Sequence, residues 1–469
     1  MARTASASIP GATDITAVVD TARRAFQSQT TPAPLRGEQA LRRLEQAVRV
    51  HEDAILKALH DDLRKPELES VASEVSVFFQ EVRELRRHLK TFFRPARKRS
   101  PAAFFRSIST VHRRPRGVVL IIAPWNYPVQ LSLVPLAGAI ASGNSVVLKP
   151  SEMAPNVASV LSVLVQEAFP DGLVQVVNGD RYVAETLLTH RFDHIFYTGN
   201  SAVGRLIMKA ASQHLTPVTL ELGGKSPVVV TRHANVRVAA ERIAWGKGFN
   251  AGQTCVAPDY VAVDEAVHDE FVSSLKAAFS RMYGEVPLES PDLARIVNNR
   301  HYDRLCGLLD ESRGVVWGGQ REASNRAIAP AIVERVDWND SLMSEELFAP
   351  VLPVLSYTSL DDLVSRINAL PQPLALYVFS EKRREVEDIF NRIPSGGGSV
   401  NDVVIHVASS ALPFGGVGDS GFGRYRGVYS LQTFTFERAV VTHYTFPELR
   451  FRYPPYKGKL KLMRMILRH

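Results

Sequence analysis

Cys255 and Glu221 have side chains that could act as a nucleophile and a base. Cys255 ends the small, polar segment 252–255 (GQTC), where a thiolate could reach an electrophile. A lone cysteine is more often a small packing residue, and Cys306, beside Leu305 and Leu309, is that ordinary case. Glu221 lies in 219–227 (TLELGGKSP), where apolar neighbours leave it poorly solvated. Such a carboxylate is either paired structurally or kept with a raised pKa for base chemistry.

Two glycine-containing segments could contact phosphate groups. Residues 223–226 (GGKS) look like the end of a P-loop, but that motif needs a glycine at 219, where Thr219 stands, so we exclude it. The turn 197–204 (YTGNSAVG) follows an apolar strand and opens a helix, whose free N–H groups could face an anion. Its spacing is G-x-x-x-x-G rather than G-x-G-x-x-G, and many such turns bind nothing.

The elements around these residues alternate between strand and helix. No residue between 117 and 148 is charged, a length that could span a bilayer, but four interruptions at Pro124, Asn126, Pro128 and Pro135 argue against it. The pattern instead predicts a strand, a helix and a strand, at 118–122, 131–141 and 145–148. Uniformly apolar strands are typical of a parallel sheet covered by helices on both faces.

The alternation continues along the chain and predicts two α/β units. Further strands are expected at 173–177, around 194–197 and from 218, with helices from Tyr182 and Ser201 between them. A second α/β unit is expected from about 228 to 379, with helices at 234–247 and 268–282. The proline-rich basic stretch 94–116 is expected to leave the first unit as an oligomerisation hairpin.

Composition narrows the class of protein. A chain of 469 residues with 45% hydrophobic and 22% charged residues indicates a globular protein of two or three domains. Two cysteines exclude a disulfide framework and favour a reducing, cytoplasmic location, and residues 1–14 have no apolar core of a signal peptide. No Cys/His cluster has metal-ligand spacing, so no metal is expected. The net charge of +8 comes without a nucleic-acid motif, so we expect solvated or interface faces rather than nucleic-acid binding.

Seven segments, in order, resemble the aldehyde dehydrogenase superfamily. The form of residues 125–128 (WNYP), the segment 413–423 and the tail 452–455 (RYPP) resemble its class 3 branch, which includes fatty aldehyde dehydrogenases. The separation of 34 residues between Glu221 and Cys255 is also similar to that branch. The seven segments are 123–128 (APWNYP), 149–152 (KPSE), 197–204, 221–227 (ELGGKSP), 252–255, 345–351 (EELFAPV) and 413–416 (PFGG).

This resemblance implies an α/β, aldehyde dehydrogenase-like fold. It implies a Rossmann-type NAD(P)-binding domain at 1–93 and 117–222, and an α/β catalytic domain at 223–420. An oligomerisation arm and C-terminal tail would occupy 94–116 and 421–469. It also implies a homodimer built by pairing sheet edges, since tetramers of the superfamily usually have a longer N-terminal extension.

The resemblance also implies the oxidation of aldehydes to carboxylic acids with NAD or NADP. Cys255 would attack the aldehyde, and the Asn126 side-chain amide and the Cys255 N–H would hold the oxyanion, each donor being typically worth about 3 kcal/mol. Glu221 would activate the water that hydrolyses the thioester. Tyr127 and Phe414 would line an apolar funnel for medium or long aliphatic and aromatic aldehydes.

The residues implied for the cofactor each have an ordinary interpretation too: Lys149 as a loop charge, Glu152 as a helix cap and Phe348 as core. Their ordered occurrence favours cofactor binding. A carboxylate at the ribose disfavours a 2′-phosphate, although class 3 enzymes often accept both cofactors. The set comprises Lys149 and Glu152 at the adenosine ribose, Gly199, Asn200 and Gly204 at the pyrophosphate with Trp125 close by, and Glu346 and Phe348 at the nicotinamide riboside.

Two departures from the family bear on these expectations. Ala349 stands where the family usually has glycine, so its methyl group is expected to crowd the backbone or shift Phe348. Residues 425–430 (YRGVYS) lack the histidines that class 3 members often carry there, so substrate preference does not carry over from those enzymes.

Two other functions and one property of the tail stay open. Cys255 and Glu221 could serve a cofactor-independent thioesterase, or the fold could be catalytically silent, although no catalytic residue is lost. The tail after Tyr456 contains five cations and no acid, with Leu460, Met463 and Leu467 on one helical face. That pattern suits packing on the catalytic domain or a partner subunit, which we favour, or weak peripheral contact with an anionic membrane.

Overall fold

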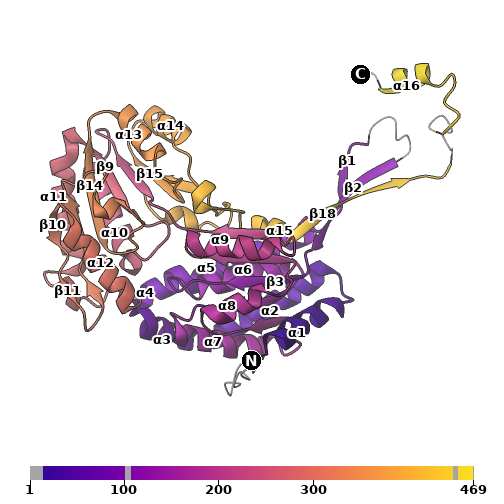
Figure 1. Cartoon of the computed structure of the whole chain (residues 1–469), viewed down its shortest axis with the longest axis horizontal. Coiled ribbons are helices and arrows are strands. Elements are labelled where there is room, and N and C mark those ends of the chain that lie inside the picture. Colours follow the sequence, from indigo (N-terminus) through magenta and orange to yellow (C-terminus); the bar gives the residue numbers. More distant parts are fainter. Residues whose placement is uncertain (1–13, 101–106, 447–452, 468–469) are drawn as a thin grey trace, which may run out of the picture.

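The computed structural model describes residues 14–100, 107–446 and 453–467. It contains a six-stranded sheet, a seven-stranded sheet and a three-stranded arm that extends away from both (Figure 1). Residues 1–13, the arm segment 101–106, and Arg452 and Arg468 of the expected tail lie outside the described residues.

The first sheet has the order β17-β7-β6-β3-β4-β5 and is parallel except for β17. This confirms the strand-helix-strand unit predicted around residues 118–148. The strands are β3 (Val118–Ile122), β4 (Ser145–Lys149), β5 (Val174–Val176), β6 (His194–Thr198), β7 (Val218–Glu221) and β17 (Gly421–Phe422).

Alternate residues of β3 face two separate hydrophobic clusters, as the pleat of a strand requires. Val119 and Ile121 pack in one cluster, and Val118, Leu120 and Ile122 in the other. The helices that flank this sheet are α1 (Ile15–Gln27), α2 (Ala33–Val50), α3 (Glu52–Leu63), α4 (Glu67–Ser70), α5 (Ser76–Phe92), α6 (Gln130–Ala141), α7 (Pro155–Ala168), α8 (Arg181–Leu188), α9 (Ser201–Ser212) and α15 (Val428–Thr433).

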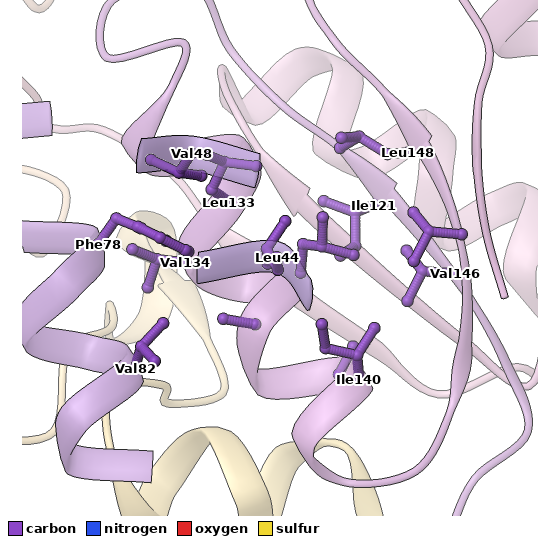
Figure 2. Packing of buried hydrophobic residues seen from close by; sticks show 14 of the residues in the cluster. Leu44, Val48, Phe78, Val82, Ile121, Leu133, Val134, Ile140, Val146 and Leu148 are labelled. Carbon is purple, nitrogen blue, oxygen red and sulfur yellow. The ribbon is translucent and has the colours of Figure 1, made fainter. Parts of the chain in front are cut away.

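The cluster that contains Val119 and Ile121 explains why residues 117–148 are uncharged. Every residue of α6 is buried, because α2 and α5 cover it with their apolar faces. Figure 2 shows Leu44 of α2 and Phe78 of α5 in the cluster that also holds Ile121 of β3. Among the described residues, no helix has the length and apolar character needed to span a bilayer.

The second sheet has the order β10-β13-β14-β9-β8-β15-β16. Cys306 lies in α12 and packs against the cluster that contains Leu305 and Leu309, which confirms its structural role in the helix. The strands are β8 (Pro227–Val230), β9 (Tyr260–Asp264), β10 (Val315–Gly318), β13 (Ala331–Glu334), β14 (Val351–Tyr357), β15 (Ala375–Phe379) and β16 (Gly397–Val400), and the helices are α10 (Val236–Gly248), α11 (His268–Tyr283), α12 (Asn299–Glu311), α13 (Leu360–Asn368) and α14 (Arg383–Arg392).

The arm consists of β1 (Ala96–Lys98), β2 (Ser107–Pro115) and β18 (Thr435–His443), all antiparallel. The chain returns to the arm later than the expected residue 421. Before doing so it forms β17, which pairs with β7, and α15, which packs against α5 and α6. Beyond the arm, α16 (Leu460–Leu467) lies far from both large sheets (Figure 1).

Candidate active site

The predicted site residues follow the carboxyl ends of neighbouring parallel strands. Lys149, Thr198 and Glu221 end β4, β6 and β7, and the register places Ile122 opposite Lys149 and Thr198 opposite Glu221. Asn126 follows β3 by four residues. In open α/β sheets this edge is where ligands bind.

Cys255 reaches this edge from the second unit through a sharply turned loop. After α10, Asn250 and Ala251 both have φ of 51° and Gly252 has φ of 70°, all in the left-handed region. A Cβ at Gly252 would lie 2.2 Å from the carbonyl oxygen of Ala349, so only glycine fits there. Gln253 ties the loop to residue 295, because its Nε2 donates to the carbonyl of Arg295 at 2.9 Å.

The predicted oxyanion donor contacts the same loop. The buried Asn126 donates one amide N–H through Nδ2 to the carbonyl oxygen of Gln253 at 3.1 Å. An amide carries two N–H groups, so a second remains for a ligand. Next to it, the Tyr127 hydroxyl lies 2.6 Å from Oγ1 of Thr254, the residue before Cys255. The structure therefore brings the predicted nucleophile and oxyanion donor together.

The Cys255 thiol is only partly exposed, and its surroundings favour the protonated form. Burial raises its pKa, and the nearby carboxyl groups of Glu346 and Glu221 raise it further. The backbone N–H groups of Cys255 and Val256 oppose this shift, because they stabilise a thiolate. Burial and the two carboxyl groups therefore favour the thiol, whereas the backbone N–H groups favour the thiolate.

Glu221 is buried at 2% exposure beside this thiol. Neither of its carboxylate oxygens has a hydrogen-bond partner within the described part of the chain. Burial raises its pKa well above the ordinary 4.5, whereas the guanidinium groups of Arg424 and Arg426 lower it. A carboxylate with a raised pKa and free oxygens is suited to accept a proton near neutral pH.

Residues at the ends of β4 and β6 form a partly charged cradle. Lys149 is 3% exposed and donates through Nζ to Oε2 of Glu152 at 3.0 Å. The Asn200 side chain caps α9 by accepting from the Val203 N–H at 2.9 Å. A Cβ at Gly199 would lie 2.2 Å from the Tyr197 hydroxyl, so the close turn depends on glycine. A helix N-terminus beside a glycine turn fits a pyrophosphate.

Gly204 lies one turn into α9, where a Cβ would meet Cδ2 of Leu222 at 3.1 Å. The glycine therefore lets α9 lie close to the chain that leaves β7. This supports a packing role for Gly204 beneath the cradle, in addition to the cofactor contact that the motif predicts.

Glu346 and Phe348 face the cradle from the second unit. A Cβ at Gly223 would lie 2.0 Å from Oε2 of Glu346, and burial raises the pKa of that carboxyl to about 8. Phe348 has a φ of 55°, and its ring lies 5.5 Å from that of Trp125. The fully buried Ala349 packs its methyl group in a hydrophobic cluster. The residues predicted for the nicotinamide riboside therefore fit a ribose and a planar ring.

The two predicted substrate-lining residues differ in their surroundings. Tyr127 is 6% exposed, whereas Phe414 is half-buried and packs against the cores of both units. Trp245, 38% exposed, has its ring 5.3 Å from that of Phe249 near the end of α10. Trp245 and Phe249 thus place two aromatic rings where α10 leads into the loop that carries Cys255.

The sequence interpretation missed a set of buried and half-buried polar residues beneath the site. The acidic residues of segment 65–74 (KPELESVASE) have the spacing of an ordinary helix surface, so nothing in the pattern marked them as buried. The missed residues are Lys65, Glu69, Glu74, Asn250 and Gln253, with Arg424 and Arg426 near Glu221.

Comparisons with known proteins agree with this geometry. Residues 2–440 match the model of the aldehyde dehydrogenase family. The chain is 43% identical to the 4,4'-diaponeurosporen-aldehyde dehydrogenase of Staphylococcus aureus, with 94% of this chain and 96% of that protein covered. It is 41% identical to the dimeric NADP-preferring aldehyde dehydrogenase of Canis lupus familiaris, with 95% and 99% covered.

A solved structure described as the substrate-bound state of Staphylococcus aureus AldH superposes with a TM-score of 0.94 at 42% identity. The match covers 97% of this chain and 99% of that one. The expected family, fold and cofactor class are thereby confirmed. The chain belongs to the aldehyde dehydrogenase family and oxidises aldehydes with NAD or NADP.

Proposed function

We propose that this enzyme uses Cys255 as nucleophile, Asn126 as oxyanion donor and Glu221 as base on apolar, medium- or long-chain or aromatic aldehydes. The observation that carries the proposal is the hydrogen bond from the Asn126 amide to the carbonyl of Gln253, two residues before Cys255. It supports a carbonyl oxygen bound between the second amide N–H and the Cys255 backbone N–H.

In the first step, the Cys255 thiol releases its proton to solvent, and its sulfur bonds to the carbonyl carbon. The carbonyl oxygen takes up the negative charge, and the two N–H donors stabilise it. Acceptance of a hydride from this carbon is the chemistry that NAD(P) would supply when bound. Lys149, Glu152, Trp125 and Glu346 would hold it, with Gly199, Asn200 and Gly204 around its pyrophosphate and Phe348 beside its ring.

In the second step, Glu221 takes a proton from water and the hydroxyl oxygen attacks the thioester carbon. The carbon–sulfur bond then breaks, the carboxylic acid leaves, and the proton returns to the sulfur. A thioester is electrophilic enough for a carboxylate base to suffice. Free oxygens and a raised pKa at Glu221 support this role.

Incubating the protein with NAD or NADP and a panel of aldehydes, while following absorbance of the reduced cofactor, tests the proposal. We expect the highest kcat/KM for aldehydes with long or aromatic apolar groups, because Tyr127 contacts the nucleophile loop and Trp245 and Phe249 lie where α10 leads into it. Equal or better use of short, polar aldehydes would contradict the substrate class. Thioester hydrolysis without any cofactor reduction would instead favour the thioesterase alternative.

The proposal on cofactor preference rests on Glu152. Its carboxylate would disfavour a 2′-phosphate, whereas the ammonium of Lys149, 3.0 Å away, would attract one. We therefore propose that the enzyme accepts both cofactors with NAD preferred. Glu152→Gln should shift the ratio of kcat/KM values towards NADP, and an unchanged ratio would remove Glu152 from this role.

We also propose a homodimer formed by sheet-edge pairing. β18 is the outer strand of the arm and β16 the outer strand of the seven-stranded sheet, so among the described residues each has one edge without a partner strand. Leu206 of α9 is 55% exposed, an apolar side chain that a partner could cover. Light scattering should give the mass of two chains at micromolar concentration, and the mass of one chain would contradict it.

The proposal also covers the C-terminal tail and the cellular location of the enzyme. Leu460 and Met465 of α16 are 62% and 70% exposed, so the described residues leave these two apolar side chains of the helix uncovered. We propose that it covers the partner subunit, in a cytoplasmic enzyme with free cysteines. Salt-sensitive co-sedimentation with anionic vesicles, lost when the chain ends at Tyr456, would instead favour the membrane alternative.

A further inference from the structure

A lysine ammonium lies buried directly beneath the oxyanion donor. Lys65 follows α3, and its side chain is 0% exposed. Its Nζ donates to the main-chain carbonyl oxygen of Asn126 at 3.0 Å. The same Nζ lies 4.1 Å from the centroid of the Tyr127 ring. One cation therefore contacts both sides of the peptide bond that joins Asn126 to Tyr127.

Glu74 fixes this ammonium and the chain that follows Asn126. It lies in the π-helical turn Val71–Val75, and its side chain is also 0% exposed. Its Oε1 accepts from Lys65 at 2.5 Å. Its Oε2 accepts from the backbone N–H groups of Val129 and Gln130 at 3.1 and 2.8 Å. The pair thus connects the turn before α6 to the N-terminal helices.

The same carbonyl oxygen has a second donor from the nucleophile loop. Asn250 donates through Nδ2 to the Asn126 carbonyl at 2.9 Å. The backbone N–H of Asn250 donates in turn to Oε2 of Glu69 at 2.9 Å. Segment 65–74 therefore contacts both the oxyanion donor and the loop that carries Cys255.

We propose that Lys65, held by Glu74, is a positioning residue that orients the Asn126 amide for the first chemical step. The inference rests on the proposed role of Asn126 as oxyanion donor. The Asn126 side chain is joined to the peptide unit that Lys65 holds, so a shift of that unit moves the amide relative to the Cys255 sulfur. A displacement of about 1 Å can cost about a hundredfold in rate.

A purely structural role for the pair makes a different prediction. Buried ion pairs often contribute little net stability, and losing one partner is destabilising because the other charge stays buried. A structural role would therefore lower stability and affect cofactor binding and every chemical step alike. A positioning role would slow the step that uses the Asn126 amide and leave cofactor affinity unchanged.

The test uses Lys65→Met, which keeps the length of the side chain and removes its charge. The double variant Lys65→Met/Glu74→Gln removes both charges, so it stays informative if the uncompensated Glu74 prevents folding of the single variant. Lys57→Met is the matched control, because Lys57 lies in α3, shortly before Lys65 in the chain, and its side chain is 74% exposed. Thermal melting and titration with NAD establish folding and cofactor affinity for each full-length variant.

Rapid mixing with aldehyde and NAD then gives the rate of the first turnover. We expect Lys65→Met, or the double variant, to slow this burst by about tenfold to a hundredfold with cofactor affinity unchanged. Lys57→Met should match the wild type. In the Asn126→Ala background the Lys65 substitution should add little, because the group that it positions is gone.

Three results would overturn the proposal: an unchanged burst rate, a loss of cofactor affinity of the same size, or a Lys65 effect undiminished in the Asn126→Ala background. A normal burst in Asn126→Ala alone would have a different meaning. It would remove Asn126 from the oxyanion site, so the proposed function itself would fail at that residue.

Discussion

The two halves of the active site are built in opposite ways. Around Cys255 and Asn126, hydrogen bonds connect the amide, the nucleophile loop and the buried residues beneath them. Around Glu221, neither carboxylate oxygen has a partner within the described residues. The two halves are nevertheless close, since Glu221 contributes to the raised pKa of Cys255.

This difference matches what each step of the proposed reaction needs. Oxyanion donors act best when they are fixed in advance, because the protein then spends no free energy on reorganisation during the reaction. A base that must reach a water molecule and take its proton benefits from free oxygens and a raised pKa. The hydrogen-bonded half therefore suits thioester formation, and the free carboxylate suits thioester hydrolysis.

The largest effect should come from removing the nucleophile. Cys255→Ala should abolish dehydrogenase activity, because Cys306, the other cysteine, packs in α12, while folding and NAD binding stay intact. Steady-state assays of cofactor reduction measure the loss. Cys306→Ala is the matched control and should stay active, whereas substantial turnover by Cys255→Ala would sink the assignment.

The second largest effect should come from the free carboxylate. Glu221→Gln should lower the steady-state rate by about 10²–10⁴, the usual contribution of a general base, because thioester hydrolysis becomes limiting. The first turnover should still appear as a burst of reduced cofactor in rapid-mixing traces. A normal steady-state rate without a burst would remove Glu221 from the second step.

The donor on the hydrogen-bonded half should give a smaller effect, confined to the first step. Asn126→Ala should slow the first turnover by about a hundredfold, because one oxyanion donor is lost. Single-turnover measurements at saturating NAD separate this from hydrolysis, and no burst is expected because the first step limits. If Asn126→Ala instead accumulates acyl-enzyme, the division between the two halves is wrong.

The smallest effect concerns pH. Glu221 acts as a base only when deprotonated, and burial raises its pKa well above 4.5. The rate of thioester hydrolysis should therefore rise with pH, about tenfold per unit below the raised pKa, and level off above it. This rise with pH should be absent from the residual hydrolysis rate of Glu221→Gln. Its persistence in that variant would assign it to another group, such as Glu346, whose pKa is raised to about 8.

The sequence predicted those parts of the fold and site that depend on local pattern. Apolar runs with an intervening helix predicted β3, α6 and β4 nearly to the residue. The motifs indicated Cys255, Asn126 and Glu221, whose catalytic roles stay predictions. Short segments of fixed spacing suffice there because each residue lies at the end of its own strand or in its own loop.

What the sequence did not predict depends on contacts between distant segments. Lys65 lies 61 positions from the carbonyl group that it contacts, and no local pattern distinguishes it from an exposed helix-end cation. The sequence placed the return to the arm at residue 421, whereas β18 begins at Thr435. The reason is the same, because residues 421–422 form β17 through their pairing with β7 and not through a pattern of their own. The methyl group of Ala349 did not need extra room, since the hydrophobic cluster accommodates it.

The mass of the enzyme during turnover tests most directly whether a thioester forms at Cys255 and is hydrolysed with Glu221 as base. Glu221→Gln, mixed with NAD and an aldehyde and then quenched in acid, should gain the mass of one acyl group on the peptide that contains Cys255. Glu221→Gln/Cys255→Ala should gain none. An adduct on another residue, or slow turnover by Glu221→Gln with no adduct at all, would contradict a thioester at Cys255 that Glu221 resolves.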